Sequence, residues 1–370
     1  MSKPIKVLQV IPQLGPSGIS SVVMNWLREI DTNEVTFDFI CFSDGQYREE
    51  VEALGCKVFK IPTFKQAPLV HIRMVGQILR EKDGGYDVIH VHNSFKNFVM
   101  LAIAKKYGVA LRVCHSHTAG LELTWMKPIF GVIKSVTKRL SNLYVACGIE
   151  AGKFLFGYDK FTVLNNAIKV ESYLPSANDE ASVSRILAQY NIPSNKQLLI
   201  HVGRFSEVKN HTFLLELANS ASLSDDYHFV CVGEGPLKQL FIHEIKECRL
   251  SHRFSILPAN NDIALLLSAS SAFVMPSLFE GVSVALLEAQ AAQLPCFVAD
   301  TISLEADMGL ALVEFLSLES PDHWVEQLNH LKDKSLEDAI IKQAFYNKQY
   351  SIEAVTEQLV TLYKNALEAR

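Results

Sequence analysis

The sequence contains no apolar run of the roughly 20 residues that a membrane-spanning helix needs. Basic residues are not in excess either: the net charge of the 370 residues is -5, whereas a general nucleic-acid-binding protein carries a basic surplus. The opening residues MSKPIKVLQVI predict a β-strand rather than a signal peptide, because Gln9 interrupts their apolar run. We therefore expect a cytoplasmic protein that does not bind nucleic acid.

Cysteine is infrequent, and its seven occurrences include no CxxC pair. Several cysteines lie inside apolar runs such as YVACG and FVCVG. A disulfide framework or a cysteine-ligated metal site is therefore not expected. The cysteines are predicted to be buried free thiols in a reducing compartment.

The GxGxxG fingerprint of dinucleotide-binding folds is also absent. In the loop after the first predicted strand, PQLGPSGISS, Gly15 and Gly18 are followed by no third glycine. This loop therefore gives little support to hydride transfer. It still fits a cleft loop in which a ligand approaches the start of the following helix.

What the sequence does contain is a regular alternation of short β-rich runs with longer amphipathic stretches, which predicts parallel sheets covered by helices on both faces. A polar stretch after Asn166 separates two such series. We therefore predict an α/β fold with two doubly wound domains, 1–170 and 171–348, and a terminal helix at 349–370 that returns to the first domain. The runs predicted as strands are IKVLQVI, VTFDFICF, KVFKI, DVIHVH, LRVCHS, LYVACG, FTVLNN, QLLIHVGR, YHFVCVGEG, RFSILPA, SAFVMPS and LPCFVAD.

One stretch, LFEGVSVALLEAQAAQLP at 278–295, lacks lysine and arginine altogether yet contains Glu280 and Glu288. A buried carboxylate without a partner is unfavourable, so we expect both side chains to face a ligand instead of protein. In doubly wound domains ligands bind beyond the carboxyl ends of the strands, and the natural place here is the cleft between two such domains. Glu288 lies about one helical turn inside that stretch, where a ribose diol could donate hydrogen bonds to it.

The same stretch predicts a helix start. Ser283 is expected to cap a helix that runs from Val284 to about Ala292. The backbone N–H groups of Gly281, Val282 and Ser283 would then point into the cleft, where they offer a binding site for an anion.

Two cations follow another predicted strand, in HVGRFSEVKNH at 201–211. Arg204 offers a planar fork of donors and Lys209 a point charge, so together they can hold a diphosphate. The alternative is that both are solvated loop cations. The nearby turn VGEGPLK fits either a ligand loop or a simple tight turn.

The run LRVCHSHTAG ends a predicted strand with His115 and His117, which alternation places on one face of the extended chain. No third metal ligand is evident, so metal binding by this pair is not expected. His117 lies nearer the loop and is better placed to meet a substrate, whereas His115 is expected to be an ordinary packed or surface histidine.

Together, VGRFSEVKN, VGEGP and PSLFEGVSVALLEAQAAQLP resemble the donor domain of the retaining glycosyltransferases of family four, which have the GT-B fold. The spacing of Glu280 and Glu288 is similar to that family's E-x7-E pattern. The resemblance extends over nearly the whole chain and is nearest to bacterial enzymes that build exopolysaccharide or capsule. It implies an acceptor-binding N-terminal domain and a donor-binding C-terminal domain.

The resemblance also implies residue roles. Arg204 and Lys209 would hold the donor diphosphate, and Glu288 would hold the ribose. Glu280 and His117 would be the catalytic residues beside the transferred sugar, with His115 as the alternative to His117 because HSH permits either alignment.

The sequence departs from the family pattern at three positions. Gln293 stands where the family commonly has glycine, which could alter that end of the helix. Ser283 and Val284 replace a more usual step containing glycine or proline, so the preferred donor sugar stays open.

The chemistry implied by the resemblance is transfer with retained configuration from a UDP-sugar to a glycan or lipid-linked glycan, without a metal or other cofactor. Double displacement needs two carboxylates about 5 Å apart that flank the sugar. Both glutamates come from one helix start, which suits binding better. Two alternatives stay open: a nucleotide-sugar epimerase, and a non-catalytic GT-B subunit that binds a glycan or another transferase.

Residues 125–142, WMKPIFGVIKSVTKRLSN, combine aromatic and aliphatic residues with four cations. Such a basic amphipathic pattern can lie on an anionic bilayer surface, which would place the protein at the inner face of the cell membrane. The alternative is a helix packed on the sheet with its lysines in solvent.

Overall fold

The computed structural model describes residues 3–15, 18–80, 85–92, 98–117, 127–259, 262–331 and 335–369. The chain divides into two compact units. The N-terminal unit comprises Met1–Ala167 with Ile352–Arg370, and the C-terminal unit comprises Ile168–Ser351. The chain therefore crosses from one unit to the other close to residues 170 and 348, where the sequence analysis places its domain limits.

The N-terminal unit is built on a parallel sheet, which has seven strands in the order β3-β2-β1-β4-β5-β6-β7 within the described residues. Its central strands are buried on both faces, as expected for a parallel sheet between two helical layers. The strands are β1 (Ile5–Gln13), β2 (Val35–Ser43), β3 (Val58–Lys60), β4 (Val88–Val91), β5 (Leu111–Ser116), β6 (Leu143–Ala146) and β7 (Thr162–Val163).

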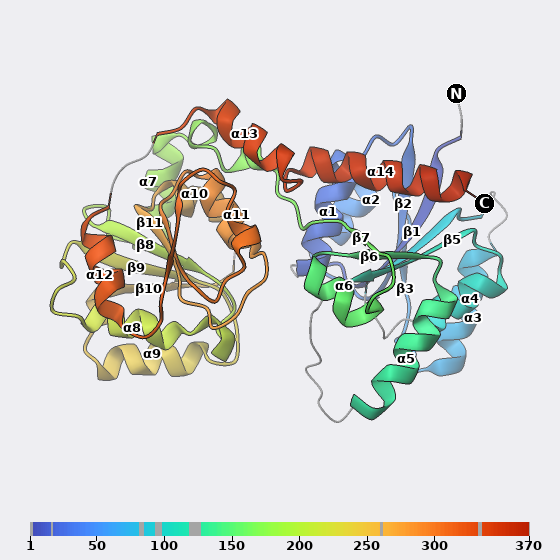
Figure 1. The fold of residues 1–370 in the computed structure, drawn as a ribbon, viewed down its shortest axis with the longest axis horizontal. Helices are drawn as coiled ribbons and strands as arrows, with labels where there is room; N and C mark the ends of the chain where they lie inside the picture. The colour runs from blue at the N-terminus through green and yellow to red at the C-terminus, as the bar shows by residue number, and fades with distance from the viewer. Residues whose placement is uncertain are drawn as a thin grey trace. The chain divides into compact units, whose positions relative to one another are not determined.

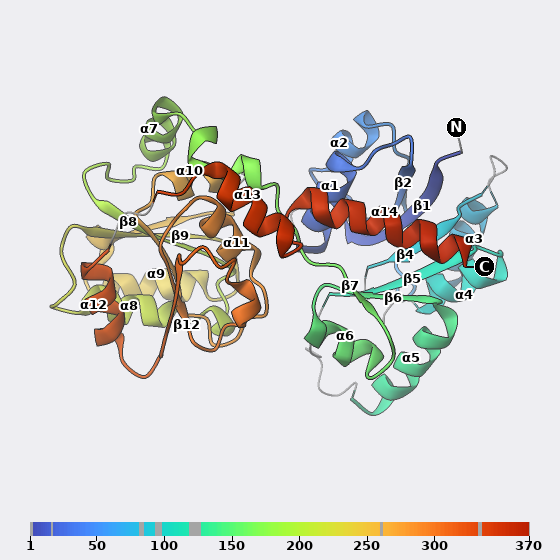
Figure 2. The same cartoon turned by 45° about the horizontal axis from the view of Figure 1, so that its top comes forward.

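Helices cover both faces of this sheet. One face packs against α1 (Gly18–Glu29), α2 (Arg48–Ala53) and α14 (Ile352–Glu368). The other packs against α3 (Pro68–Leu79), α4 (Phe98–Lys106), α5 (Lys127–Leu140) and α6 (Ile149–Phe156). The last helix, α14, lies beside α1 (Figures 1 and 2). The predicted terminal helix and its return to the N-terminal unit are thus observed.

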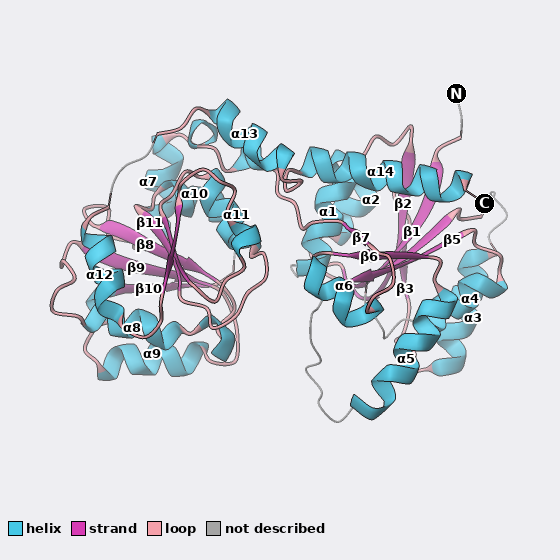
Figure 3. Ribbon diagram, viewed as in Figure 1, coloured by secondary structure: helices cyan, strands magenta, loops and turns pink. Residues whose placement is uncertain are grey.

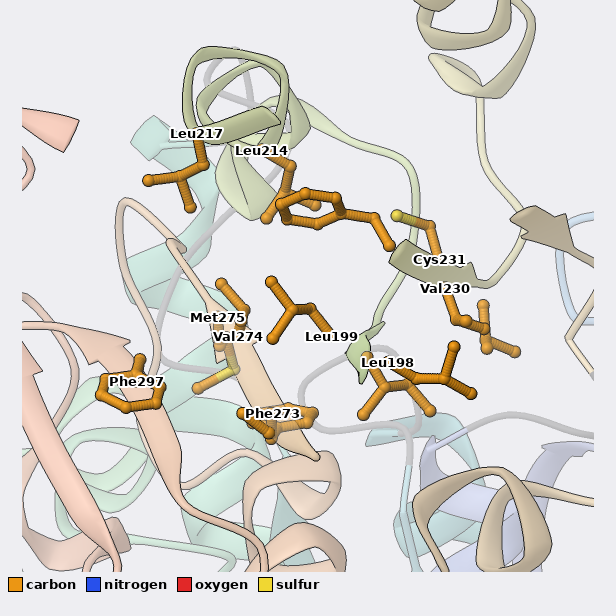
Figure 4. Packing of buried hydrophobic residues seen from close by; sticks show 14 of the residues in the cluster. Leu198, Leu199, Leu214, Leu217, Val230, Cys231, Phe273, Val274, Met275 and Phe297 are labelled. Carbon is orange, nitrogen blue, oxygen red and sulfur yellow. The ribbon is translucent and has the colours of Figure 1, made fainter. Parts of the chain in front are cut away.

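The C-terminal unit repeats this plan with a parallel sheet that has six strands within the described residues, in the order β10-β9-β8-β11-β12-β13. Figure 3 labels four of them, β8 to β11. Figure 4 shows part of its core, in which Leu214 and Leu217 of α8 lie over Leu199 of β8. The strands are β8 (Gln197–Val202), β9 (Tyr227–Val232), β10 (Phe254–Leu257), β11 (Ala272–Met275), β12 (Cys296–Ala299) and β13 (Val313–Leu316). The helices are α7 (Glu180–Gln189), α8 (His211–Asn219), α9 (Lys238–Glu247), α10 (Ile263–Ser268), α11 (Val284–Ala291), α12 (Pro321–Asn329) and α13 (Asp338–Asn347).

The fold prediction of two doubly wound α/β units is confirmed, and every run predicted as a strand forms one. The strand that the sequence analysis missed is β13. It lies at the sheet edge, only its last residue is buried, and Glu314 interrupts its apolar pattern. An edge strand needs less apolar sequence because one side has no neighbouring strand.

The prediction of buried free thiols holds for Cys41, Cys114, Cys231 and Cys296, but Cys248 is exposed. Cys248 follows α9 directly, where the chain turns at the surface. Within the described residues, every helix is too short or too polar to cross a bilayer.

Candidate functional site

In the C-terminal unit the strand order reverses between β8 and β11. Open α/β sheets bind ligands at such a switch point, beyond the carboxyl ends of the strands. The loops that follow these two strands are tied together, because the N–H of Leu278 donates to the carbonyl oxygen of Val208 over 2.8 Å. The cation-bearing loop and the glutamate-bearing loop are therefore neighbours at this edge of the sheet.

The glycines of the turn after β9 allow that turn to pack directly against the loop after β8. A Cβ atom on Gly233 would lie 2.0 Å from the carbonyl oxygen of Gly203, and one on Gly235 would lie 2.3 Å from that of Phe205. Lys238 donates from Nζ to the carbonyl oxygen of Gly233 over 3.0 Å. The VGEGPLK turn thus supports the cation-bearing loop through close backbone packing, as its tight-turn interpretation predicts.

The two predicted diphosphate-binding cations differ in their surroundings. Lys209 Nζ pairs with Glu280 Oε1 over 2.5 Å, and the two side chains are only 15% and 21% exposed. Arg204 is exposed, and its guanidinium makes no ion pair or hydrogen bond with any described residue. Because an ammonium group has three donors, Lys209 can hold Glu280 and still donate to an anionic ligand.

The expectation that Glu280 and Glu288 face no protein partner is wrong. Glu280 pairs with Lys209, and Glu288 accepts a hydrogen bond of 2.7 Å from the hydroxyl of Tyr173. Both partners lie outside the stretch 278–295, so its local composition could not reveal them. The two carboxylates differ in kind, since a cation neutralises Glu280 whereas Glu288 has a neutral donor.

Burial raises the pKa of Glu288 to about 7, and the hydrogen bond from Tyr173 opposes this rise. No described lysine or arginine pairs with Glu288. A carboxylate in this state gains from additional hydroxyl donors, because each donor favours the ionised form. The site therefore suits a ligand that brings neutral hydroxyl groups to Glu288.

The helix predicted after Ser283 is α11, which begins at Val284 and ends one residue before the predicted end. The predicted side-chain cap is wrong, because the hydroxyl of Ser283 makes no capping hydrogen bond. The backbone N–H groups of Gly281, Val282 and Ser283 donate to no acceptor in the described part of the chain. These groups are therefore available to an anion at the helix N-terminus.

In the N-terminal unit the strand order reverses between β1 and β4. Gly15 follows β1 and Gly18 begins α1, while the intervening Pro16 and Ser17 lie outside the described residues. A Cβ atom on Gly18 would meet no atom of the described residues within 4 Å, so these residues leave open space beside the helix start. Ligand approach at this loop stays a prediction.

The strands β4 and β5 each end in a His-x-His pattern, and the four rings form a stack. His90, His92 and His115 are completely buried, whereas His117 is partly exposed. His115 and His117 have ring centroids 4.0 Å apart, and those of His90 and His92 are 4.2 Å apart. Of the two histidines considered for a substrate role, only His117 is accessible.

Hydrogen bonds connect the stack to the surrounding helices and strands. Gln9 Oε1 lies 2.8 Å from His92 Nε2, and His92 Nδ1 lies 3.0 Å from His117 Nε2. The hydroxyl of Tyr363 in α14 lies 2.6 Å from His90 Nδ1. Burial lowers the pKa of His117 to about 3, which keeps this imidazole neutral at physiological pH.

A metal ion does not suit this stack as it stands. His90, His92 and His115 bring nitrogens within 4.8 Å of one another. Zinc requires nitrogens about 2 Å from a common centre, with lone pairs that converge on it. The rings of His90 and His92 are stacked 20° from parallel, so their in-plane lone pairs run side by side. The expected absence of a metal in the reaction stays a prediction.

The segment 125–142 begins outside the described residues, since Trp125 lies there. In α5, Phe130 and Ile133 pack against the core of the N-terminal unit. Lys134 and Lys138 donate to carbonyl oxygens of α6. One side of α5 therefore packs on the N-terminal unit, as the packed-helix alternative expects, and Lys134 and Lys138 are also bound to protein. Contact of this segment with a bilayer stays a prediction.

Several residues of the site were not predicted. His90 and His92 could have been found, because DVIHVH repeats the His-x-His pattern of LRVCHSH in what proves to be the adjacent strand. Gln9 had been noted only as an interruption of an apolar run. Tyr173 lies in the polar stretch at the start of the C-terminal unit and has no sequence signal of its own.

The sequence relationships of the chain agree with this geometry. Residues 182–346 match the family described as Glycosyl transferases group 1, and residues 17–145 match the Glycosyl transferase 4-like domain. The chain is 34% identical over 340 residues to EpsF of Bacillus subtilis, whose name designates it a glycosyltransferase. That match covers 87% of this chain and 86% of EpsF. The chain therefore belongs to the same glycosyltransferase family as EpsF.

Another relative of this glycosyltransferase is the Escherichia coli UDP-Gal:alpha-D-GlcNAc-diphosphoundecaprenol alpha-1,3-galactosyltransferase, 28% identical over 311 residues, or 79% of this chain and 78% of that enzyme. Among solved structures, Anabaena HepE with UDP and glucose has a TM-score of 0.75 at 17% identity, covering 97% of this chain and 99% of HepE. A Rickettsia africae glycosyltransferase has a TM-score of 0.79 at 15% identity, covering 100% of both chains. These matches confirm the GT-B fold and glycosyl transfer, and support neither the epimerase nor the non-catalytic alternative.

Replacing Glu288 by glutamine should raise the thermal unfolding midpoint of the glycosyltransferase, and more at about pH 8 than at about pH 5. The folded-state pKa of about 7 lies above the ordinary value of 4.5, so ionisation of Glu288 lowers stability as the pH rises through this interval. Glutamine keeps an acceptor for Tyr173 but removes the charge. Scanning calorimetry should show the difference, with the exposed Glu247→Gln on α9 as the control. An equal gain at both pH values would contradict the raised pKa.

Proposed function

We propose that this glycosyltransferase moves a sugar from a UDP-sugar to a glycan or lipid-linked glycan acceptor with retention of anomeric configuration. The carrying observation is that Arg204, Lys209 and the start of α11 lie in adjacent loops at one switch point. The names of two relatives support the substrate classes. The Escherichia coli relative is named for a UDP-Gal donor and a diphosphoundecaprenol-linked acceptor, and a Campylobacter jejuni relative, 28% identical over 189 residues, for a diphospho-undecaprenol acceptor.

The donor diphosphate would be held by cations and backbone N–H groups, without a metal. Arg204 is free to donate a bidentate pair, and Lys209 has donors left beyond its bond to Glu280. The N–H groups of 281–283 add the partial positive charge of the α11 N-terminus. Because the diphosphate gains negative charge as the glycosidic bond breaks, these groups stabilise the transition state more than the bound substrate.

Glu288 would accept hydrogen bonds from the ribose diol, which brings the neutral donors that this carboxylate lacks. Glu280 would lie beside the transferred sugar. Its ion pair with Lys209 withdraws negative charge from the carboxylate and weakens it as a nucleophile. This favours a one-step reaction on one face of the sugar. The acceptor oxygen bonds to the anomeric carbon, the bond to the diphosphate breaks, and the leaving oxygen takes the acceptor's proton.

The donor assignment can be tested by ligand-observed NMR with UDP-, GDP- and ADP-sugars. We expect saturation transfer to the UDP-sugar, and a marked loss of it in Glu288→Gln because a carboxamide accepts ribose hydrogen bonds more weakly. The control Glu247→Gln should bind as the wild type does. Binding of no nucleotide sugar would contradict the proposed function, and a preference for GDP or ADP would correct the donor.

Arg204→Ala and Lys209→Ala should each lower turnover by roughly a hundredfold, the usual effect of removing one electrostatic contact to developing charge. Release of nucleoside diphosphate on addition of acceptor is the measurement. Lys246→Ala, which removes an exposed cation from α9, is the matched control. Added Mg²⁺ or a chelator should change the wild-type rate little. Strict dependence on a divalent ion, with near-normal turnover in both variants, would show that these side chains do not have this role.

We also propose that the N-terminal unit contacts an anionic bilayer through α3 and the loop before it. The exposed apolar side chains of this surface are Phe64 at 40%, Leu69 at 82%, Val70 at 48% and Ile72 at 43%. Lys65 and Arg73 are exposed among them, and residues 61–80 contain no aspartate or glutamate. Apolar side chains flanked by cations fit the headgroup region of an anionic membrane.

Flotation with vesicles tests the membrane surface. Wild-type protein should float with phosphatidylserine-containing vesicles several-fold more than with neutral phosphatidylcholine vesicles. Leu69→Glu should abolish this difference, because it places a carboxylate in the apolar patch. Leu304→Glu, at a residue 73% exposed in the C-terminal unit, should not. Equal recovery with both lipids, or equal losses in both variants, would contradict the α3 surface.

A further inference from the structure

A chain of hydrogen bonds leads from the buried side chain of Gln9 to the accessible ring of His117. Gln9 Oε1 meets His92 Nε2 over 2.8 Å, and His92 Nδ1 meets His117 Nε2 over 3.0 Å. Gln9 and His92 are completely buried, so no solvent competes for these bonds. The remaining nitrogen, Nδ1 of His117, makes no hydrogen bond with any described residue.

The positions of the protons along this series of hydrogen bonds follow from Gln9, its first member. A carboxamide oxygen can only accept, so His92 Nε2 must carry the proton. A neutral imidazole has a single N–H, which leaves His92 Nδ1 bare and able only to accept from His117 Nε2–H. The one proton of His117 is then used, and its Nδ1 is bare. Burial lowers the pKa of both rings, which keeps them in the neutral state that this assignment requires.

The Gln9 amide presents its oxygen to His92. Oε1 lies 2.8 Å from His92 Nε2, whereas Gln9 Nε2 makes no hydrogen bond with any described residue. Strands β1 and β4 are adjacent and pair Gln9 with His90, which brings the Gln9 side chain to the end of β4.

We propose that Gln9 and His92 are positioning residues that hold His117 in its Nε2-protonated tautomer, so that its bare Nδ1 accepts a hydrogen bond from a hydroxyl group of the sugar substrate. The identity of that hydroxyl donor rests on the proposed function, whereas the tautomer does not. Without these hydrogen bonds, His117 would carry its proton on either ring nitrogen. A fraction of the protein molecules would then present an N–H donor at Nδ1, where the sugar hydroxyl needs an acceptor.

A second chain in the same stack provides an internal control. The hydroxyl of Tyr363 meets His90 Nδ1, and His90 Nε2 meets His115 Nδ1 over 3.1 Å. It ends at His115 Nε2, which is buried and has no partner among the described residues. The rings of this inner series, His90 and His115, stack on those of the outer series, His92 and His117, but no hydrogen bond joins the two series. Phenylalanine at His90 should keep the ring stack and interrupt only the inner chain.

The tautomer can be read directly from long-range ¹H–¹⁵N correlation spectra of the full chain labelled with ¹⁵N-histidine, with His117 assigned from its loss in His117→Gln. We expect the wild type to show His117 protonated on Nε2 only. His92→Phe should show a mixture of both tautomers, whereas His90→Phe should leave His117 unchanged. A wild-type His117 protonated on Nδ1, or a His117 signal that His92→Phe does not alter, would overturn the proposal.

Kinetics on the same variants test the consequence for the reaction. Gln9→Leu and His92→Phe should lower kcat by about tenfold, the effect of losing one hydrogen bond, with little change in KM for the nucleotide sugar. His92→Asn should recover most of the rate, because its side-chain oxygen can accept from His117 Nε2–H in place of Nδ1. Equal losses in His92→Asn and His92→Phe would overturn the positioning role. A locked tautomer in a protein that binds no nucleotide sugar would refute the proposed function while leaving the proton assignment intact.

Discussion

All strands of a parallel sheet point the same way, and this constraint decides where the polar groups of the glycosyltransferase can be. The loop after every strand therefore lies at the same edge of the sheet, and the reversal of strand order makes two of those loops neighbours. In the C-terminal unit this brings the loop of Arg204 and Lys209 beside the loop of Glu280. In the N-terminal unit the parallel pairing of β4 with β5 brings the ends of these two strands together, and with them the His-x-His patterns.

The cost of burying a charge then determines which charged groups can lie side by side at this edge. Glu280 and Lys209 are both mostly buried, and each makes the other's charge tolerable. Glu288 has only the hydroxyl of Tyr173, and the raised pKa of Glu288 reports the remaining cost of its charge. A ligand that brought hydroxyl groups to Glu288 would reduce this cost.

The fold could be predicted because alternation of apolar runs is a local property. It found every strand except β13, whose edge position relaxes the demand for apolar residues. Arg204, Lys209, Glu280 and His117 follow strand ends and could be named for the same reason, and Glu288 by its place one turn into the next helix. Their partners could not, since Tyr173 and Glu288 are separated by 115 residues and meet only after the unit has folded. The missing cap at Ser283 is a similar case, because residue type permits a cap while tertiary geometry decides whether it forms.

The C-terminal helix shows how a distant segment enters the polar core. α14 returns to the N-terminal unit through an apolar face that includes Val355 and Leu359. The same packing buries Tyr363 and sets its hydroxyl against His90. Buried hydroxyl groups and imidazole nitrogens are usually hydrogen-bonded, and here the Tyr363 hydroxyl and His90 Nδ1 pair with each other. The hydrophobic docking of α14 therefore supplies the partner of His90, while the strand β1 supplies that of His92 through Gln9. The accessible edge of the stack is in this way determined by residues that are themselves removed from solvent.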